Sequence, residues 1–126
     1  MTINLPFPPS VNMIWRTMVR GKRAITYMSA DGKEYRNDVR VRVLESGIRS
    51  TLTGRLTVEI LIHPPDRRKR DIDNSLKALL DSMQHAGVYK DDSQIDWLLV
   101  RRGDLRSNGC VEVTIKEYPA DGDLPL

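Results

Sequence analysis

The sequence predicts a small single-domain α/β fold in which a mixed sheet packs against two main helices. Segments rich in β-branched residues alternate with two segments of helical periodicity, in the order β, α, β, α, β, β. The length of 126 residues is typical of one domain, and the chain shows neither repeats nor a linker. We therefore expect one domain over residues 1–118, followed by a frayed tail over 119–126.

The N-terminal quarter predicts one strand and one irregular segment. Residues 2–7 read as a short strand, because the Pro8-Pro9 pair that follows cannot continue a ladder of hydrogen bonds. Residues 12–25 are rich in cations around Gly21 and read as a loop or a loose hairpin.

The first helix is predicted over about residues 30–46. Ser29 is a favourable N-cap, and Gly47 is a favourable end. Apolar side chains recur at helical spacing and mark the face that packs on the core: Tyr35, Val39 and Val43, with Leu44 as a further candidate.

The second half predicts three strands and one helix. The strands are expected over residues 56–62, 95–101 and 110–116, the last with clean alternation of apolar and polar side chains. The helix is expected over about 74–85, ending at Gly87. Its apolar stripe has the spacing i, i+3, i+4, i+7: Leu76, Leu79, Leu80 and Met83.

Composition excludes several classes of protein. No apolar run reaches the roughly 20 residues of a transmembrane helix, the N-terminus lacks a signal-peptide pattern, and the single Cys110 cannot form an intrachain disulfide. We therefore expect a cytoplasmic protein. The net charge of +3 is uneven, because residues 1–50 carry +5 and residues 51–126 carry −2.

Four cations at positions 67–70 directly precede a pair of acids, Asp71 and Asp73. Cations at this density favour a phosphate-bearing partner. The acids have an ordinary structural explanation, since Asp73 stands where a helix N-cap belongs and Asp71 could belong to a turn. In extended chain, however, residues i and i+2 project to the same side, so both carboxylates could bind one cation.

A second acidic group follows the predicted helix. The return of the chain after Gly87 could bring Asp91 or Asp92 beside the first pair of acids. Carboxylates without nearby His or Cys ligands select Mg²⁺, with Mn²⁺ as a substitute. Lys77 lies four residues after Asp73 and could stabilise charge on a phosphodiester during hydrolysis.

At these residues the chain resembles the RusA family of Holliday junction resolvases. The matching stretches lie in the family's order: 5–10 with Asn12, 29–32 before Tyr35-Arg36, 65–74, and 86–92. The resemblance implies a homodimeric α/β nuclease that binds Mg²⁺ and cuts four-way DNA junctions symmetrically. It implies that Asp71, Asp73 and Asp92 are the essential acids and that Lys77 is the catalytic lysine, with Asp91 able to assist.

DNA contacts are expected from two groups of residues. The first adjoins the acids, and the second lies in the basic segment near the N-terminus, where it could hold another arm of a junction. In each case a solvated run of charges is the competing interpretation. The candidates are Arg67, Arg68, Lys69, Arg70 and Asn74, together with Arg16, Arg20, Lys22 and Arg23.

The predicted function is therefore a Mg²⁺-dependent resolvase of four-way junctions. One alternative is the same metal site acting on flaps, other branched DNA or a small phosphoester. Another is a non-catalytic protein that binds branched DNA. Paired cuts also imply a homodimer, whose interface is expected at an exposed sheet edge, either the strand 110–116 or the strand 2–7.

Overall fold

The computed structural model describes residues 1–10 and 15–118, including all their side chains except those of Trp15 and Arg16. The predicted tail, 119–126, lies outside these residues. The fold is the small α/β domain expected, with strands β1 (Thr2–Pro6), β2 (Trp15–Arg20), β3 (Arg23–Met28), β4 (Arg55–His63), β5 (Ile95–Arg102) and β6 (Cys110–Tyr118), helices α2 (Ala30–Glu45) and α3 (Leu76–His85), and a short 3₁₀ helix η1 (Asp92–Gln94).

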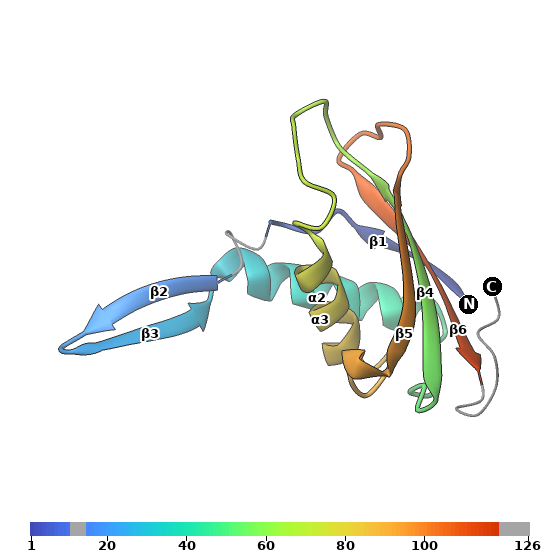
Figure 1. Ribbon diagram of the computed structural model, residues 1–126, viewed down its shortest axis with the longest axis horizontal. Helices are drawn as coiled ribbons and strands as arrows, with labels where there is room; N and C mark the ends of the chain where they lie inside the picture. Colours follow the sequence, from blue (N-terminus) through green and yellow to red (C-terminus); the bar gives the residue numbers. More distant parts are fainter. Residues whose placement is uncertain (11–14, 119–126) are drawn as a thin grey trace.

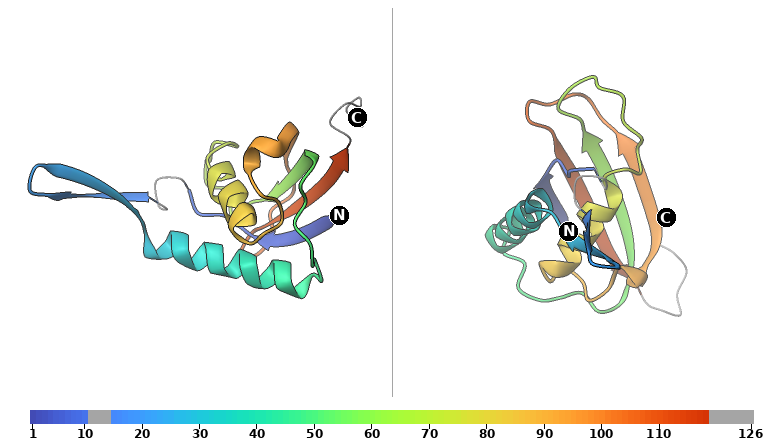
Figure 2. Two further views of the ribbon diagram at one scale, coloured as in Figure 1. Left: turned by 90° about the horizontal axis from the view of Figure 1, so that it is seen from below. Right: turned by 90° about the vertical axis from the view of Figure 1, so that its left-hand side faces the viewer.

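The main sheet has four strands in the order β1-β6-β4-β5. β4 and β5 are parallel and are connected through α3, whereas the other neighbours are antiparallel, so the predicted mixed sheet is confirmed. Both helices cover the same face of this sheet (Figures 1 and 2). Neither helix of the described part is long and apolar enough to cross a membrane.

The core lies between the helices and the covered face of the sheet. β4 contributes Leu56, Val58, Ile60 and Ile62 at every second position, as expected for a central strand. The predicted stripe on α2 is buried at Tyr35, Val39 and Val43, and that on α3 at Leu79 and Met83, with Leu76 and Leu80 partly buried. Leu44 does not belong to the stripe, because it points away from the core and is 64% exposed.

The helix ends follow local signals with one exception. Ser29 caps α2 by accepting a hydrogen bond from the Gly32 amide at 3.2 Å. Gly47 and Gly87 follow the two helices with φ values of 83° and 85°, which favour glycine. The exception is α3, which begins at Leu76 rather than at residue 74.

A two-stranded hairpin, which we call the arm (β2 and β3), projects from the domain (Figure 1). This confirms the hairpin interpretation of the basic segment, although residues 11–14 lie outside the described part. Gly21 at the tip has φ of 62°, and every side chain from 17 to 27 is exposed. The arm therefore adds nothing to the core.

The sheet topology corrects one expectation. β6, predicted as a candidate edge, lies between β1 and β4 and has no free edge. The edge strands are β1, as predicted, and β5. On β5, Leu98 and Leu99 are 41% and 38% exposed.

Candidate active site

The loops after β4 and β5 meet at one end of the sheet, because these two parallel strands end at the same edge. The Gly103 amide donates to the Ile62 carbonyl at 2.8 Å, and the Arg106 amide donates to the Pro64 carbonyl at 3.0 Å. A Cβ at position 103 would lie 2.6 Å from the buried His63 ring, so glycine permits this close approach. The rigid end of the sheet thus positions the cationic loop 64–70.

Within this loop, Arg70 and Asp66 form the structural part. The Arg70 guanidinium donates to the Asp66 carboxylate at 2.8 Å and lies 5.4 Å from the centre of the Phe7 ring. Hydrogen bonds from Arg70 and from the Arg68 amide hold the pKa of Asp66 below its usual value. Arg102, at the end of β5, donates to the Arg70 carbonyl and fixes the other side of the loop.

The remaining cations of the loop are free to bind a ligand. The side chains of Arg67, Arg68 and Lys69 are exposed and form no ion pair with any residue in 1–10 or 15–118. A cavity of about 400 Å³ opens beside them and is lined by Pro64, Asp66, Arg67, Arg68, Lys69, Arg70, Arg102, Gly103 and Leu105. Five cations around one cavity favour an anionic partner.

Asp71 and Asp73 occupy a turn rather than extended chain. The Asn74 amide donates to the Asp71 carbonyl at 3.2 Å, and the Leu76 amide donates to the Asp73 carbonyl at 3.1 Å. Asp73 is therefore not the N-cap of α3. That position belongs to Ser75, whose side chain makes no capping hydrogen bond. Both carboxylates are exposed beside the cationic loop.

Lys77 and Asp81 lie one helical turn apart on α3, with 3.5 Å between Nζ and Oδ2. Lys77 is 61% exposed, so its ammonium group is accessible from solvent. Asp81 is half-buried, and its negative charge also contributes to the raised pKa of Asp92, in the segment that follows the helix.

A hydrogen bond holds Asp92 beside α3, because its amide donates to Gln84 Oε1 at 3.0 Å. The preceding Asp91 caps η1 by accepting from the Ser93 amide at 2.9 Å. Partial desolvation and the neighbouring carboxylates of Asp91 and Asp81 raise the pKa of Asp92, and Lys77 opposes them. The hydrogen bonds from Ser93 lower the pKa of Asp91. The two adjacent acids therefore have different environments.

These features form one strip along the domain. It begins at the cationic loop, passes through the turn with Asp71 and Asp73, and continues along α3 past Lys77 to Asp92. Among known proteins, the family model described as "Endodeoxyribonuclease RusA" matches residues 6–116. The chain belongs to the RusA family.

Individual RusA proteins match the chain over nearly its whole length. A crossover junction endodeoxyribonuclease from Enterobacteria phage HK97 is 40% identical over 113 residues, which are 90% of this chain and 91% of the relative. The corresponding protein of Enterobacteria phage 82 is 36% identical over 91% of this chain and 92% of its own. That of Escherichia coli strain K12 is 35% identical over 92% and 93%.

The donor chemistry of the strip fits a hard divalent cation such as Mg²⁺. The acids offer only carboxylate oxygens, which are the ligands that such a cation prefers. The pKa of Asp92 is raised first by its partial burial and then by the neighbouring carboxylates of Asp91 and Asp81. The geometry is incomplete, however. Within residues 1–10 and 15–118, no three His, Cys, Asp or Glu side chains lie close enough to hold one ion. The structure thus keeps Asp71 and Asp73 in one turn but does not assemble them with Asp92 around a point.

Two residues of the site were not predicted from the sequence. Asp81 contacts Lys77 at the i, i+4 spacing, which is a readable signal for an ion pair on a helix. Arg102 contacts the cationic loop because β5 runs parallel to β4, which was not deduced from the strand order.

The predicted DNA contacts Arg20, Lys22 and Arg23 are exposed at the tip of the arm, and the side chain of Arg16 lies outside the described part.

Proposed function

We propose that this protein is a Mg²⁺-dependent endonuclease that resolves four-way DNA junctions by paired, symmetric cuts. The observation that carries the proposal is the continuity of the strip. A cationic loop adjoins a turn that bears Asp71 and Asp73, inside a region that matches the RusA family from residue 6 to 116. The relatives' names, crossover junction endodeoxyribonuclease, supply the substrate class. The proposal places the protein in the cytoplasm with its DNA.

The cationic loop would bind the phosphate backbone. Arg67, Arg68 and Lys69 have no ion-pair partner among the described residues, and they lie on a loop that Arg70 and Asp66 hold in shape. Arg102, at the end of β5, adds a further cation to the lining of the same cavity. Phosphate contacts of this kind set the position and register of the DNA without reading its sequence.

The acids and Lys77 would carry out the hydrolysis. Asp71, Asp73 and Asp92 would hold Mg²⁺, or Mn²⁺ in its place, which would supply an activated water and stabilise charge on the phosphate. Lys77 contributes a positive charge on the same helix face as Asp81, in reach of the strip. Asp81 would keep the long lysine side chain oriented when no substrate is bound.

The arm would hold a second part of the junction. Between residues 15 and 28 it contains four cations and no acid. A two-stranded ribbon fits the major groove of B-DNA. Arg20, Lys22 and Arg23 lie around the tip, where the ribbon reaches farthest from the domain (Figure 1).

Paired cuts require two active sites, and one chain carries one strip. We therefore propose a symmetric homodimer. The free edge of β5, with exposed Leu98 and Leu99, and the free edge of β1 are the surfaces that support it. Light scattering at micromolar concentration should give twice the monomer mass of 14.4 kDa. A monomer that still makes paired symmetric nicks would contradict the dimer.

The decisive assay compares DNA substrates. Purified protein is incubated with a synthetic four-way junction, a flap and a linear duplex, each with Mg²⁺, Mn²⁺ or EDTA, and the cuts are mapped. We expect paired cuts in the junction with either metal ion and none with EDTA. Preferential cutting of the flap would show that the flap, and not the four-way junction, is the substrate. Cutting in EDTA would contradict the proposed metal cofactor. Junction binding without cutting in any condition would leave a branched-DNA-binding protein.

A further inference from the structure

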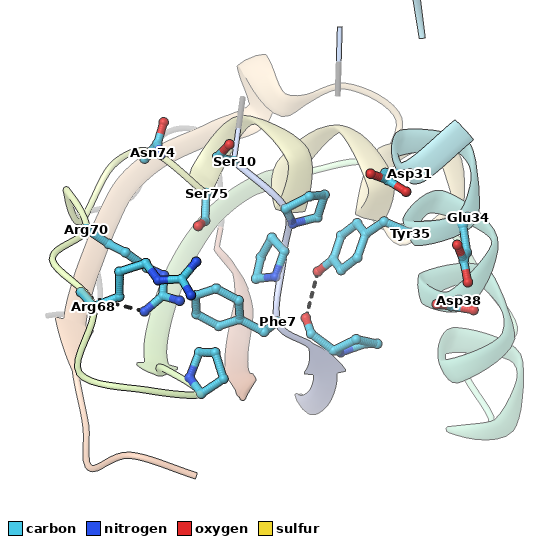
Figure 3. A pocket seen from close by; sticks show the side chains of 14 residues that line it. Phe7, Ser10, Asp31, Glu34, Tyr35, Asp38, Arg68, Arg70, Asn74 and Ser75 are labelled. Carbon is cyan, nitrogen blue, oxygen red and sulfur yellow. Dashed lines mark hydrogen bonds between the residues drawn. The ribbon is translucent and has the colours of Figure 1, made fainter. Parts of the chain in front are cut away.

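A second cavity, of about 520 Å³, lies beside the turn that bears Asp71 and Asp73 (Figure 3). Three segments far apart in the sequence line it: the end of β1 with the residues after it, the first half of α2, and the loop before α3. Its volume lies within the range of about 300–1,000 Å³ that is usual for small-ligand sites. Asn74 and Ser75 connect it directly to the proposed active site.

The floor of this cavity is apolar and rigid. Phe7, Pro8 and Pro9 follow β1, and the prolines offer no amide donors to a ligand. The chain is held here from below, because the buried Tyr35 hydroxyl donates to the Pro6 carbonyl at 2.9 Å. Such a floor suits the face of a flat aromatic ring.

The two walls carry opposite charge. Arg68 and Arg70 line one side, whereas Asp31, Glu34 and Asp38 line the other from α2 (Figure 3). The three acids are exposed and form no ion pair or hydrogen bond with any residue in 1–10 or 15–118. The walls do not neutralise each other. On the basic side, Arg68 has no ion-pair partner within residues 1–10 and 15–118, whereas Arg70 is held by Asp66 and adds positive charge from a fixed position.

We propose that this cavity binds one unpaired nucleotide of the branched DNA, with its phosphate toward Arg68 and Arg70 and its base on the Phe7–Pro9 floor. Carboxylates only accept hydrogen bonds. Facing Asp31, Glu34 and Asp38, the base must therefore donate, which favours adenine, cytosine or guanine with their exocyclic amino groups. Thymine has no exocyclic amino group, and its one ring donor on that edge, N3–H, is flanked by two carbonyl oxygens that the carboxylates repel, so thymine is disfavoured.

The inference rests on the proposed function, because the branched DNA is the source of the nucleotide. A base inside a duplex is stacked and paired and cannot enter, whereas a base at a branch point pays the least to leave the stack. The cavity would thus select branched DNA and one class of base, next to the phosphate that is cut.

The test uses four junctions with identical arms that differ in one unpaired nucleotide at the branch point, A, C, G or T. Dissociation constants are measured by fluorescence anisotropy in EDTA, so that cutting is not required. We expect the A, C and G junctions to bind about fivefold or more tightly than the T junction, as each base-specific contact of this kind discriminates by about 1–3 kcal/mol. Equal affinities would overturn the inference.

Three variants separate the effect of the cavity from general DNA binding. In the combined variant Asp31→Asn, Glu34→Gln, Asp38→Asn, the ratio of the dissociation constants for the T junction and for the A, C and G junctions should approach one, because amides both donate and accept hydrogen bonds. Glu45→Gln, on the same helix but outside the cavity, should keep it. An unchanged ratio in the triple variant would also overturn the inference. Phe7→Leu should weaken binding of the unpaired-nucleotide junctions but not of a fully paired junction.

The proposed function is judged separately in the same samples. Addition of Mg²⁺ to the fully paired junction should produce cutting. If the protein cuts the junction but binds all four unpaired nucleotides equally, the nucleotide site is contradicted and the proposed resolvase activity is supported. If it discriminates between the nucleotides but does not cut, the nucleotide site is supported and the resolvase activity is contradicted. Absence of binding to every junction would overturn both.

Discussion

The arm and the main sheet both contain antiparallel strand pairs, yet their strands are stabilised in different ways. In the sheet, β4 and β6 bury alternate side chains against α2 and α3. In the arm, β2 and β3 pair over six positions while every side chain from 17 to 27 stays exposed. A hairpin of two strands without a packing partner is only marginally stable in water.

The difference separates stability from binding. The sheet and its helices carry the free energy of folding and hold the acids in place. The arm carries four cations and no acids, which favours a negatively charged partner, and we propose that its role is to bind one. Substitutions in the two regions should therefore affect different measurements, and each prediction below tests that separation.

The largest effect is expected at the acids. Asp73→Asn keeps the volume and the turn but removes a charged ligand, so the cutting rate should fall by about two orders of magnitude or more. Junction binding should persist or tighten, because a negative charge that faces phosphate is lost and the arm is intact. Glu45→Gln is the matched control. Asp71→Asn and Asp92→Asn should behave alike.

Wild-type rates in all three variants would overturn the assignment of the acids. An inactive Asp91→Asn with an active Asp92→Asn would correct only the choice within that pair. The two differ in environment, since the pKa is lowered at Asp91 and raised at Asp92.

The second prediction compares stability in the two regions directly. Ile60→Ala removes a fully buried side chain from β4 and should cost about 2–5 kcal/mol in the free energy of unfolding. Ile25→Ala, at a position of the arm that is 40% exposed, should change it by no more than about 0.5 kcal/mol. Urea denaturation measures both. Similar losses would mean that the arm belongs to the cooperative fold.

The same contrast explains what could be predicted from the sequence. Local signals worked, because a cap such as Ser29 or a left-handed glycine such as Gly87 acts within one turn of chain. Apolar periodicity likewise identified the faces of α2 and α3. Leu44 was misplaced because it lies at the margin of its stripe, where small rotations decide burial.

Features that depend on distant pairing were harder to predict. The position of β6 inside the sheet follows from its pairing with both β1 and β4, and neither contact is local. Arg102 reaches the cationic loop for the same reason. At Asp71 the turn was the competing interpretation and is what the structure shows, in place of the extended chain that would align both carboxylates. The start of α3 at Leu76 displaced Asp73 from the cap. The candidate acids were thus chosen by residue type, and their geometry was not predicted.

The third prediction concerns the cations of the arm. Arg20→Ala and Arg23→Ala should each lower the slope of log K against log salt concentration by about one, because each removes one phosphate contact. Lys116→Ala, an exposed cation on β6, is the control and should leave the slope unchanged. The unfolding free energy should stay the same in all three variants. An unchanged slope in the arm variants would mean that these charges are only solvated.

The smallest effect on the free energy of unfolding is expected from an exposed ion pair of the main sheet. Asp96 on β5 accepts hydrogen bonds from Arg55 at the start of β4 and from Tyr118 at the end of β6, so it connects three strands. The Arg55 and Tyr118 hydrogen bonds lower the pKa of Asp96 from 3.8 to about 2. A carboxyl group with a lowered pKa in the folded state stabilises the fold above its unfolded pKa.

This contribution should be complete above about pH 4 and lost as the pH falls through about 2. Asp96→Asn should therefore make the unfolding free energy less dependent on pH between 4 and 2. The change should be small, because the pair is solvent-exposed and screened by salt. Chemical denaturation at several pH values measures it, with Asp104→Asn, another exposed acid, as the comparison. A wild-type pH dependence in Asp96→Asn would show that the connection between the three strands does not contribute to stability.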